Sequence, residues 1–178
     1  YENSLCGAHQ VDNAMTALGV LSALLDGHCL PASAIQKGLE QAQWPGRLEW
    51  LGNVLIDGAH NPQGAQTVCD YVQHFLKDRR IVLLTGMMAD KDVRSYADRI
   101  APLADEIHCV APEHIPRAMP ANELATLYRE RTEKPVFEWE ETEQALSAAQ
   151  KSAGEQGVVL ICGSLYLAGE IRRLLIAE

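Results

Sequence analysis

The spacing of apolar residues along this chain changes near residue 44. Upstream, QVDNAMTALGVLSALL (10–25) carries Ala, Leu and Met spaced around helical turns. A second helix is expected at about 31–42, because Pro31 suits a first helical turn and Ser33 follows closely. The WPGR stretch that comes next combines proline with glycine, which is typical of a linker. The first part of the chain is therefore predicted to be helical and set apart from the rest.

Beyond the linker, short apolar runs alternate with helical stretches. RLEWL and NVLID are separated by Gly52-Asn53, which favours a tight hairpin. Further strands are expected at 80–86, 106–112, 134–139 and 157–163, with helices at 62–77, 91–101, 120–131, 140–152 and 164–177. Strands joined by helices indicate parallel crossovers, and continuous apolar strands indicate that helices cover both faces. We predict an α/β fold with a Rossmann-like, mostly parallel sheet and one antiparallel edge strand from the hairpin.

Composition narrows the choice of partners. The 178 residues carry a formal net charge of −9, which argues against nucleic acid or an anionic membrane surface as a partner. The longest apolar run, around 14–25, is interrupted by Thr16 and Ser22 and is too short to span a bilayer. With 47% hydrophobic and 22% charged residues, the chain resembles an ordinary soluble globular protein.

The cysteines indicate a reducing environment. They are odd in number and scattered, and no CxxC or Cys/His spacing suggests a zinc site. Two of them lie in apolar strand-like runs, where a reduced cysteine acts as a small hydrophobic residue. The five are Cys6, Cys29, Cys69, Cys109 and Cys162. A cytoplasmic location follows as an expectation. The chain also lacks an initiator methionine and a signal-peptide pattern, so we expect a piece of a longer protein.

In open α/β sheets ligands bind at the carboxyl ends of the strands, so residues at those ends are candidates. In NVLIDGAHNP, Asp57 ends a strand, His60 lies in the turn, and Asn61-Pro62 is a favoured helix start. His60, beside a helix N-terminus, could donate a hydrogen bond to a carboxylate or phosphate. Asp57 could contact sugar hydroxyls or only hydrogen-bond the turn, and the residues alone do not decide between these.

The next strand end, GMMADKD (86–92), favours a structural interpretation. Asp90 could cap the following helix, and Asp92 suits its first turn. Lys91 could face a ligand or water.

The remaining strand ends offer a few polar candidates. In the loop APEHIPRAMP, Arg117 near His114 could bind a carboxylate bidentately, although a solvated loop arginine is an equally good interpretation. Ser164 follows a strand and a glycine; capping is its default role, yet its hydroxyl would also face the crevice. No GxSxG, Walker A or GxGxxG pattern occurs, which argues against a serine nucleophile and against a phosphate-binding loop in this chain.

Six stretches together resemble the C-terminal part of the folylpolyglutamate synthase family, often bifunctional with dihydrofolate synthase, in the Mur ligase superfamily. They are LCGAHQVDNA (5–14), PGRLEWL (45–51), LIDGAHNP (55–62), GMMADKD (86–92), IPRAMP (115–120) and CGSLYLAGEIR (162–172). The resemblance covers nearly the whole chain. It implies that residues 1–43 are the C-terminal end of an ATPase domain and that residues 44–178 are the Mur-ligase C-terminal domain.

The resemblance also implies an activity and residue roles. The family activates a folate carboxylate with ATP to an acyl phosphate, which the amine of L-glutamate attacks to form an amide. Asn13 matches a family residue near the adenine, and Arg47 matches an arginine that reaches the ATP phosphates. Asp57 matches the family's ribose-binding aspartate. His60 and Ser164 match positions at the glutamate site. Arg47 and His60 would then be the catalytic contributions of this chain.

The resemblance implies ATP and Mg²⁺ as cofactors, with the Mg²⁺ ligands, the P-loop and most of the folate surface outside this chain. The chain is therefore expected to be inactive without the missing N-terminal ATPase domain. Expected partners are folate, L-glutamate and ATP, without nucleic acid or membrane, in a protein that is monomeric at full length.

Two alternatives stay open. Another Mur-type amino-acid ligase shares the architecture, although the GSLYLAGEIR end favours the folate branch. A stand-alone Rossmann-like binding module without catalysis agrees with the missing P-loop. Folylpolyglutamate and dihydrofolate synthase activities are not separated by this sequence.

Overall fold

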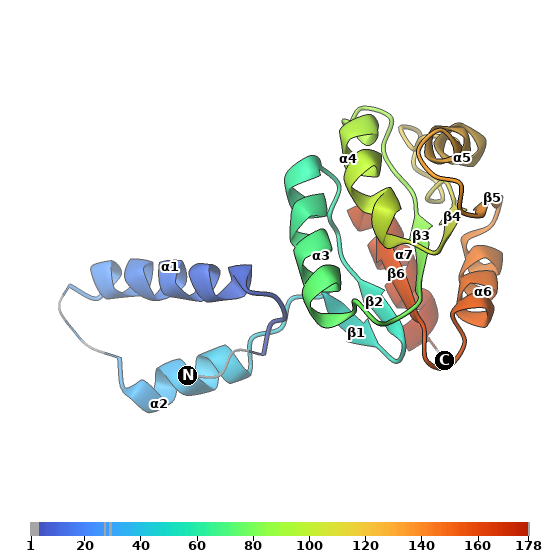
Figure 1. Cartoon of the computed structure of the whole chain (residues 1–178). Coiled ribbons are helices and arrows are strands. Elements are labelled where there is room, and N and C mark those ends of the chain that lie inside the picture. Colours follow the sequence, from blue (N-terminus) through green and yellow to red (C-terminus); the bar gives the residue numbers. More distant parts are fainter. Residues whose placement is uncertain (1–3, 27, 29, 178) are drawn as a thin grey trace.

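The chain folds into two regions that differ in shape. The computed structural model describes residues 4–26, 28 and 30–177, so the predicted role of Cys29 as a reduced cysteine lies outside the described residues. The first region is a helical pair, α1 (His9–Leu24) and α2 (Ala32–Glu40), which extends away from the rest of the molecule (Figure 1). The second, from residue 44 onward, is an α/β unit that we call the sheet domain.

The sheet domain is built on one six-stranded sheet with the order β1-β2-β6-β3-β4-β5. The strands are β1 (Glu49–Leu51), β2 (Val54–Ile56), β3 (Ile81–Thr85), β4 (Glu106–Cys109), β5 (Val136–Glu138) and β6 (Val158–Cys162). β1 pairs antiparallel with β2 across the predicted two-residue hairpin, and every other pairing is parallel. The predicted fold class is confirmed, with each strand inside or close to its expected range.

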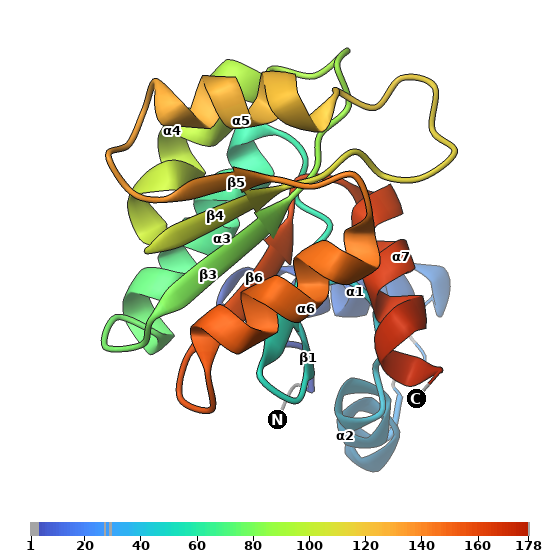
Figure 2. The same ribbon diagram turned by 90° about the vertical axis from the view of Figure 1, so that its right-hand side faces the viewer.

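Helices cover both faces of this sheet (Figure 2). They are α3 (Pro62–Phe75), α4 (Val93–Ile100), the short 3-10 helix η1 (Ala101–Leu103), α5 (Ala121–Arg129), α6 (Thr142–Ala153) and α7 (Leu165–Ile176). Successive strand residues point to opposite faces. Leu83 therefore joins a core under α3, α4 and α5, while its neighbours Val82 and Leu84 join a second core under α6 and α7. This explains why the central strands are apolar at consecutive positions.

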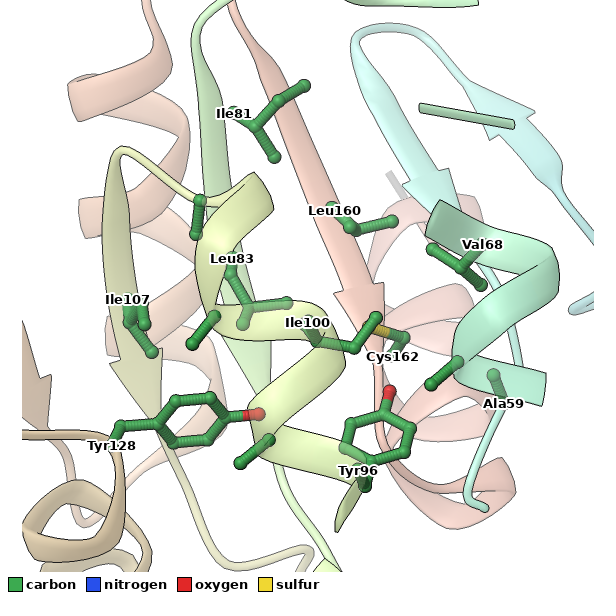
Figure 3. Close-up of a cluster of buried hydrophobic side chains, with 14 of the residues drawn as sticks. Ala59, Val68, Ile81, Leu83, Tyr96, Ile100, Ile107, Tyr128, Leu160 and Cys162 are labelled. Atoms are coloured by element: carbon green, nitrogen blue, oxygen red, sulfur yellow. The ribbon is translucent and has the colours of Figure 1, made fainter. Parts of the chain in front are cut away.

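The larger core contains two buried tyrosines. Tyr96 on α4 and Tyr128 on α5 are fully buried, and their rings lie among Leu83, Ile107 and Cys162 of the sheet (Figure 3). Burial raises the pKa of both phenols well above the ordinary value, so both stay neutral. The buried, reduced state expected for Cys162 is what the structure shows.

The start of α3 follows the prediction from the sequence, whereas the start of α4 does not. Asn61 caps α3 by accepting a hydrogen bond of 2.8 Å from the Gly64 amide, with Pro62 as first helical residue. The cap of α4 is Asp92, which accepts from the Ser95 amide at 3.1 Å. The interpretation of Asp90 as the cap is wrong, because the Asp92 carboxylate sits at the position from which it reaches the free amide of the first turn.

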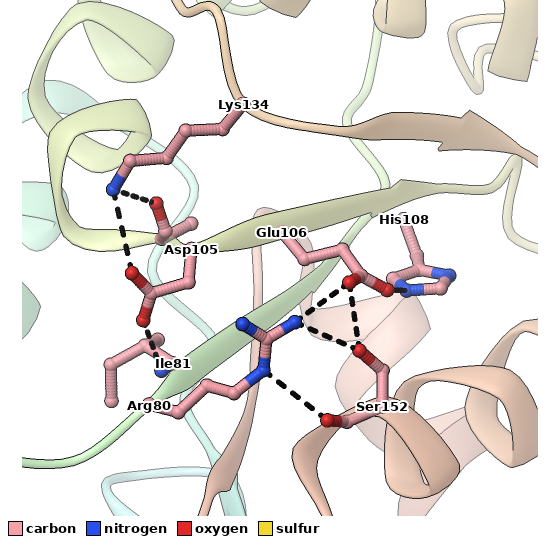
Figure 4. Close-up of polar contacts among 8 residues, drawn as sticks. Arg80, Ile81, Asp105, Glu106, His108, Lys134 and Ser152 are labelled. Atoms are coloured by element: carbon pink, nitrogen blue, oxygen red, sulfur yellow. Dashed lines mark hydrogen bonds and ion pairs between the residues drawn. The ribbon is translucent and has the colours of Figure 1, made fainter.

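A partly buried polar cluster is centred on Glu106 and His108 of β4 (Figure 4). His108 Nε2 contacts Glu106 Oε1 at 2.8 Å, and the Trp139 indole donates to His108 Nδ1 at 2.9 Å. The other Glu106 oxygen accepts from Ser152 and Arg80. Burial lowers the pKa of His108, with Glu106 opposing it. Burial alone would raise the pKa of Glu106, but its hydrogen bonds from Ser152 and His108 and the charge of Arg80 lower it.

The helical pair has almost no core of its own. Among its described residues only Gln10 is buried in α1, and none is buried in α2. Met15 and Leu24 are 64% and 76% exposed. None of the helices in the described chain combines the length and the apolarity needed to cross a bilayer.

Candidate functional site

Asp57 lies just after β2 and is committed to backbone contacts. The residue is 5% exposed. Oδ1 accepts a hydrogen bond from the Ala59 amide at 2.8 Å, and Oδ2 accepts one from the Leu48 amide at 3.0 Å. Burial raises the pKa of Asp57, while these two amides and the nearby charge of Arg47 oppose the rise. Asp57 therefore fixes its own turn, as the structural interpretation predicted, and also holds the segment that carries Arg47.

His60 is half-buried in the turn between β2 and α3. Its Nδ1 lies 2.8 Å from the Gly58 carbonyl oxygen. Because a carbonyl only accepts, Nδ1 carries the proton and Nε2 of the neutral ring presents a lone pair. Neutral His60 can thus accept a hydrogen bond from an amine, and it donates to a carboxylate or phosphate only when Nε2 is also protonated. This refines the expectation that His60 acts as a donor.

Ser164 caps α7, as the default interpretation predicted. The residue is 1% exposed, and its Oγ accepts hydrogen bonds from the amides of Tyr166 and Leu167 at 3.0 and 3.4 Å. The hydroxyl proton remains able to donate. Backbone contacts join this position to the His60 turn, because the Gly163 amide donates to the Ala59 carbonyl at 2.8 Å. The structure therefore brings the His60 and Ser164 segments together at the carboxyl ends of β2 and β6.

Arg117 is an exposed loop residue, as the solvated interpretation expected, and its guanidinium also has partners. Its guanidinium contacts Asp90 at 3.2 Å and the Tyr166 hydroxyl at 3.3 Å, and lies over the Tyr166 ring at 5.5 Å. The carboxylate that Arg117 binds in this structure belongs to Asp90. Arg117 thus borders the start of α7 as a positive charge that is already paired.

Arg47 and Asn13 line one hollow, although they lie in different regions of the chain. The hollow has a volume of about 830 Å³ and is otherwise mostly apolar, with its walls formed by α1, α2 and the linker. The Asn13 amide donates to Gln10 at 2.9 Å. The Arg47 side chain is exposed and makes no hydrogen bond or ion pair with the part of the chain that the structure describes. Its charge is therefore available to an anion.

The structure adds two residues that the sequence did not single out. Glu49 on β1 and Arg172 on α7 form an ion pair at 3.0 Å. They are 123 positions apart, so no local pattern could have indicated the pair. Within residues 4–26, 28 and 30–177, no group of three or more His, Cys, Asp or Glu side chains could hold a metal ion.

The sheet is mostly parallel with an antiparallel hairpin edge, and polar residues gather at the carboxyl ends of β2 and β6. These features define a Rossmann-like α/β domain. Residues 46–165 match the family model described as "Mur ligase, glutamate ligase domain". The match covers most of the chain, and the chain belongs to this family. The resemblance seen in the sequence is thereby confirmed.

Relatives with known names narrow the comparison. The chain is 34% identical to a folylpolyglutamate synthase of Lacticaseibacillus casei over 145 residues, which is 80% of this chain and 32% of that protein. A Mycobacterium tuberculosis folylpolyglutamate synthase complexed with ADP and AMPPCP superimposes with a TM-score of 0.90 at 29% identity, covering 97% of this chain and 41% of that one.

A third structure is a bifunctional folylpolyglutamate synthase/dihydrofolate synthase with Mn, AMPPNP and L-glutamate bound. It matches with a TM-score of 0.80 at 28% identity, covering 93% of this chain and 39% of that one. The chain therefore spans between 32% and 41% of the length of these relatives.

Proposed function

We propose that this chain is the glutamate ligase domain of an ATP-dependent ligase that joins L-glutamate to folate, with both folylpolyglutamate and dihydrofolate synthase activities open to it. The observation that carries the proposal is the backbone hydrogen bond from Gly163 to Ala59, which joins the His60 turn to the Ser164 cap at the carboxyl ends of β2 and β6. It stands in a chain that is 34% identical to a folylpolyglutamate synthase over 80% of its length. The proposal takes residues 1–43 as the end of an ATPase domain and 44–178 as the ligase domain.

In this proposal Arg47 and Asn13 serve the nucleotide. Arg47 carries an unpaired charge in the hollow that Asn13 also lines, which suits a phosphate and an adenine respectively. A cation placed at phosphate oxygens stabilises charge that builds during phosphoryl transfer. Asp57 would accept a ribose hydroxyl. Each of its oxygens makes one backbone hydrogen bond and keeps capacity for a second.

His60 and Ser164 serve the amino acid. The Nε2 lone pair of His60 suits the attacking amine, because Nδ1 already donates to Gly58. The Ser164 hydroxyl, whose oxygen accepts two backbone amides, has its proton left for a carboxylate oxygen. Their joint contribution is to hold the amine beside the activated folate carboxylate, and such positioning accounts for a large part of a two-substrate barrier.

A divalent ion belongs to the proposal, since a related structure contains Mn with AMPPNP. Its ligands are expected outside the described part of this chain, which holds no group of three suitable side chains. Bound Mg²⁺ would neutralise phosphate charge. The proposal also includes a cytoplasmic enzyme that is monomeric at full length.

A stand-alone binding module and a ligase for another acceptor are the competing functions. A binding module would hold a ligand without releasing ADP. A muramyl-peptide or cyanophycin-type ligase would release ADP with its own acceptor and not with folate.

The test uses the full-length protein and measures ADP release that depends on ATP, folate and L-glutamate. We expect His60→Ala to raise the KM for L-glutamate about tenfold or more, and Asp57→Ala to raise the KM for ATP, since each removes a ligand contact. His74→Ala, an exposed histidine on α3, is the matched control and should behave as wild type. Wild-type kinetics in both folded site variants would rule out these roles.

A further inference from the structure

The linker that carries Arg47 ends in a defined turn. The Arg47 amide donates to the Trp44 carbonyl at 3.2 Å, Pro45 occupies the second position, and Gly46 the third with φ of +73°. Proline followed by a residue with positive φ is the pattern of a type II β-turn. We call residues 44–47 the anchored turn. Arg47 is its last residue, so the turn determines the position of the backbone from which the Arg47 side chain extends.

Both polar groups of Gly46 are bound to the sheet domain. The Gly58 amide donates to the Gly46 carbonyl at 2.8 Å. The Gly46 amide donates to Glu49 Oε2 at 2.8 Å. The backbone immediately before Arg47 is therefore fixed by the end of β2 on one side and by the side chain of Glu49 on the other.

The residue after Arg47 is fixed as well. Leu48 has a buried side chain and a positive φ of 46°, an uncommon backbone conformation for leucine. Its amide is held by Asp57 at 3.0 Å. The backbone on both sides of Arg47 is thus determined by the sheet domain, while the Arg47 side chain itself stays exposed and unpaired among the described residues.

Glu49 is in turn oriented by α7. Arg172 Nε lies 3.0 Å from each of the two Glu49 oxygens, and the Glu49 side chain is mostly sheltered. The same helix begins at its Ser164 cap, about 12 Å away at 1.5 Å per residue. One rigid helix therefore connects the proposed glutamate site with the anchored turn.

We propose that Glu49, held by Arg172, is a positioning residue that directs Arg47 toward the nucleotide phosphate. This inference rests on the proposed function. The Arg172 side chain is 36% exposed, and an ion pair that solvent reaches contributes only modestly to stability. Stability alone therefore does not account for an arrangement in which one carboxylate binds both a turn amide and an arginine. Positioning does account for it, because a small misplacement of a charged group near the reacting atoms costs a large factor in rate.

The experiment measures steady-state kinetics of the full-length ligase with Glu49→Gln and Arg172→Met. We expect kcat to fall about tenfold or more in each, with the KM for L-glutamate within about twofold of wild type. Arg172→Lys keeps a cation near Glu49 and should recover part of the loss. Arg173→Met is the matched control: Arg173 is the exposed neighbour on α7, and its loss should leave kcat unchanged.

A double-mutant cycle separates positioning from a general structural role. If Glu49 acts through Arg47, adding Glu49→Gln to Arg47→Ala should not lower kcat further. Additive losses, or wild-type kcat in Glu49→Gln and Arg172→Met while Arg47→Ala is impaired, would overturn the inference and leave the proposed function standing. Full activity in Arg47→Ala would overturn the role of Arg47 itself, and with it the inference. Melting temperatures of all variants identify any that fail to fold.

Discussion

The helical pair and the sheet domain contain similar proportions of apolar side chains but use them differently. In the sheet domain each helix packs an apolar face on the sheet, and the central strands are wholly buried. In α1 the apolar residues Met15, Val20 and Leu24 are exposed. The same kind of residue therefore stabilises one region and leaves a solvent-facing apolar surface on the other. An apolar pattern predicts a helix, but only a packing partner turns that pattern into stability.

The difference also bears on function. Asn13 belongs to the helical pair, whereas Asp57, His60 and Ser164 belong to the sheet domain. Arg47 lies at the junction. The proposed nucleotide site would therefore combine residues of both regions, joined by the anchored turn.

The sharpest comparison replaces a leucine in each region. Leu83 on β3 is 0% exposed, and Leu83→Ala should lower the free energy of unfolding by about 3–4 kcal/mol, through lost burial and the remaining cavity. Leu24→Ala, at an exposed position of α1, should change it by less than about 0.5 kcal/mol. Urea denaturation followed by circular dichroism measures both. Comparable losses in the two variants would show that α1 packs more tightly than described.

Two glycines give a second, smaller contrast. Gly163 has φ of +116°, and an added Cβ would lie 2.7 Å from Thr85 Oγ1 and 2.9 Å from the Gly86 carbonyl oxygen. Gly163→Ala should cost about 2 kcal/mol through strain and crowding. Gly19→Ala on α1 meets nothing within 4 Å and should stabilise that helix by about 0.5–1 kcal/mol. Urea denaturation measures the loss of stability in Gly163→Ala, and hydrogen exchange in α1 measures the gain in Gly19→Ala. An unchanged free energy of unfolding in Gly163→Ala would contradict the described backbone.

A third prediction concerns pH and the cluster on β4. Burial lowers the pKa of His108, so as the pH falls the unfolded chain binds a proton at this residue before the folded chain does. The contribution of neutral His108 to stability is therefore fully present above the ordinary histidine pKa of about 6.5. It is lost as the pH falls below 6.5 toward the lower pKa that His108 has in the folded protein. His108→Gln can keep both hydrogen bonds without titrating, and should show less loss between about pH 7 and pH 5.5.

Comparing the wild type with His108→Gln also controls for other groups that titrate. Asp57 acts in the opposite sense, since its raised pKa makes stability fall as pH rises above its ordinary value of 3.8. It is present in both proteins, so the difference between their unfolding curves isolates His108. Parallel curves would mean that His108 does not titrate differently on folding.

The smallest expected effect tests whether the sheet domain is independent. Residues 44–178 expressed alone should fold, with a melting temperature lowered by less than about 3 °C. Some loss is expected because Cys6 packs against the larger core. Thermal unfolding followed by circular dichroism decides this, and a drop beyond about 10 °C would make the helical pair part of one cooperative unit.

Local features of this fold could be predicted from the sequence, and long-range ones could not. The hairpin at Gly52-Asn53 and the caps at Asn61 and Ser164 follow from residue chemistry within a few positions. The insertion of β6 between β2 and β3 depends on pairing between distant segments, which no local pattern records.

The candidate site divides in the same way. The residues at the strand ends could be named from the sequence, because every parallel strand directs its carboxyl end to one edge. Other features could not be predicted, because each depends on atoms that the fold brings together. They are the hydrogen bond of His60, the two amides that donate to Asp57, and the Glu49–Arg172 pair. The assigned ligands of these residues remain predictions.

The two edge strands have a consequence for behaviour at high concentration. β1 and β5 are each three residues long, and β5 directly follows Lys134-Pro135 and ends at Glu138, which pairs with Arg129. A short edge bordered by proline and charged side chains offers few free backbone groups to a strand of another molecule. The sheet is thereby protected from edge-to-edge aggregation, and any precipitation of this chain should start from the exposed side of α1 and not from β5.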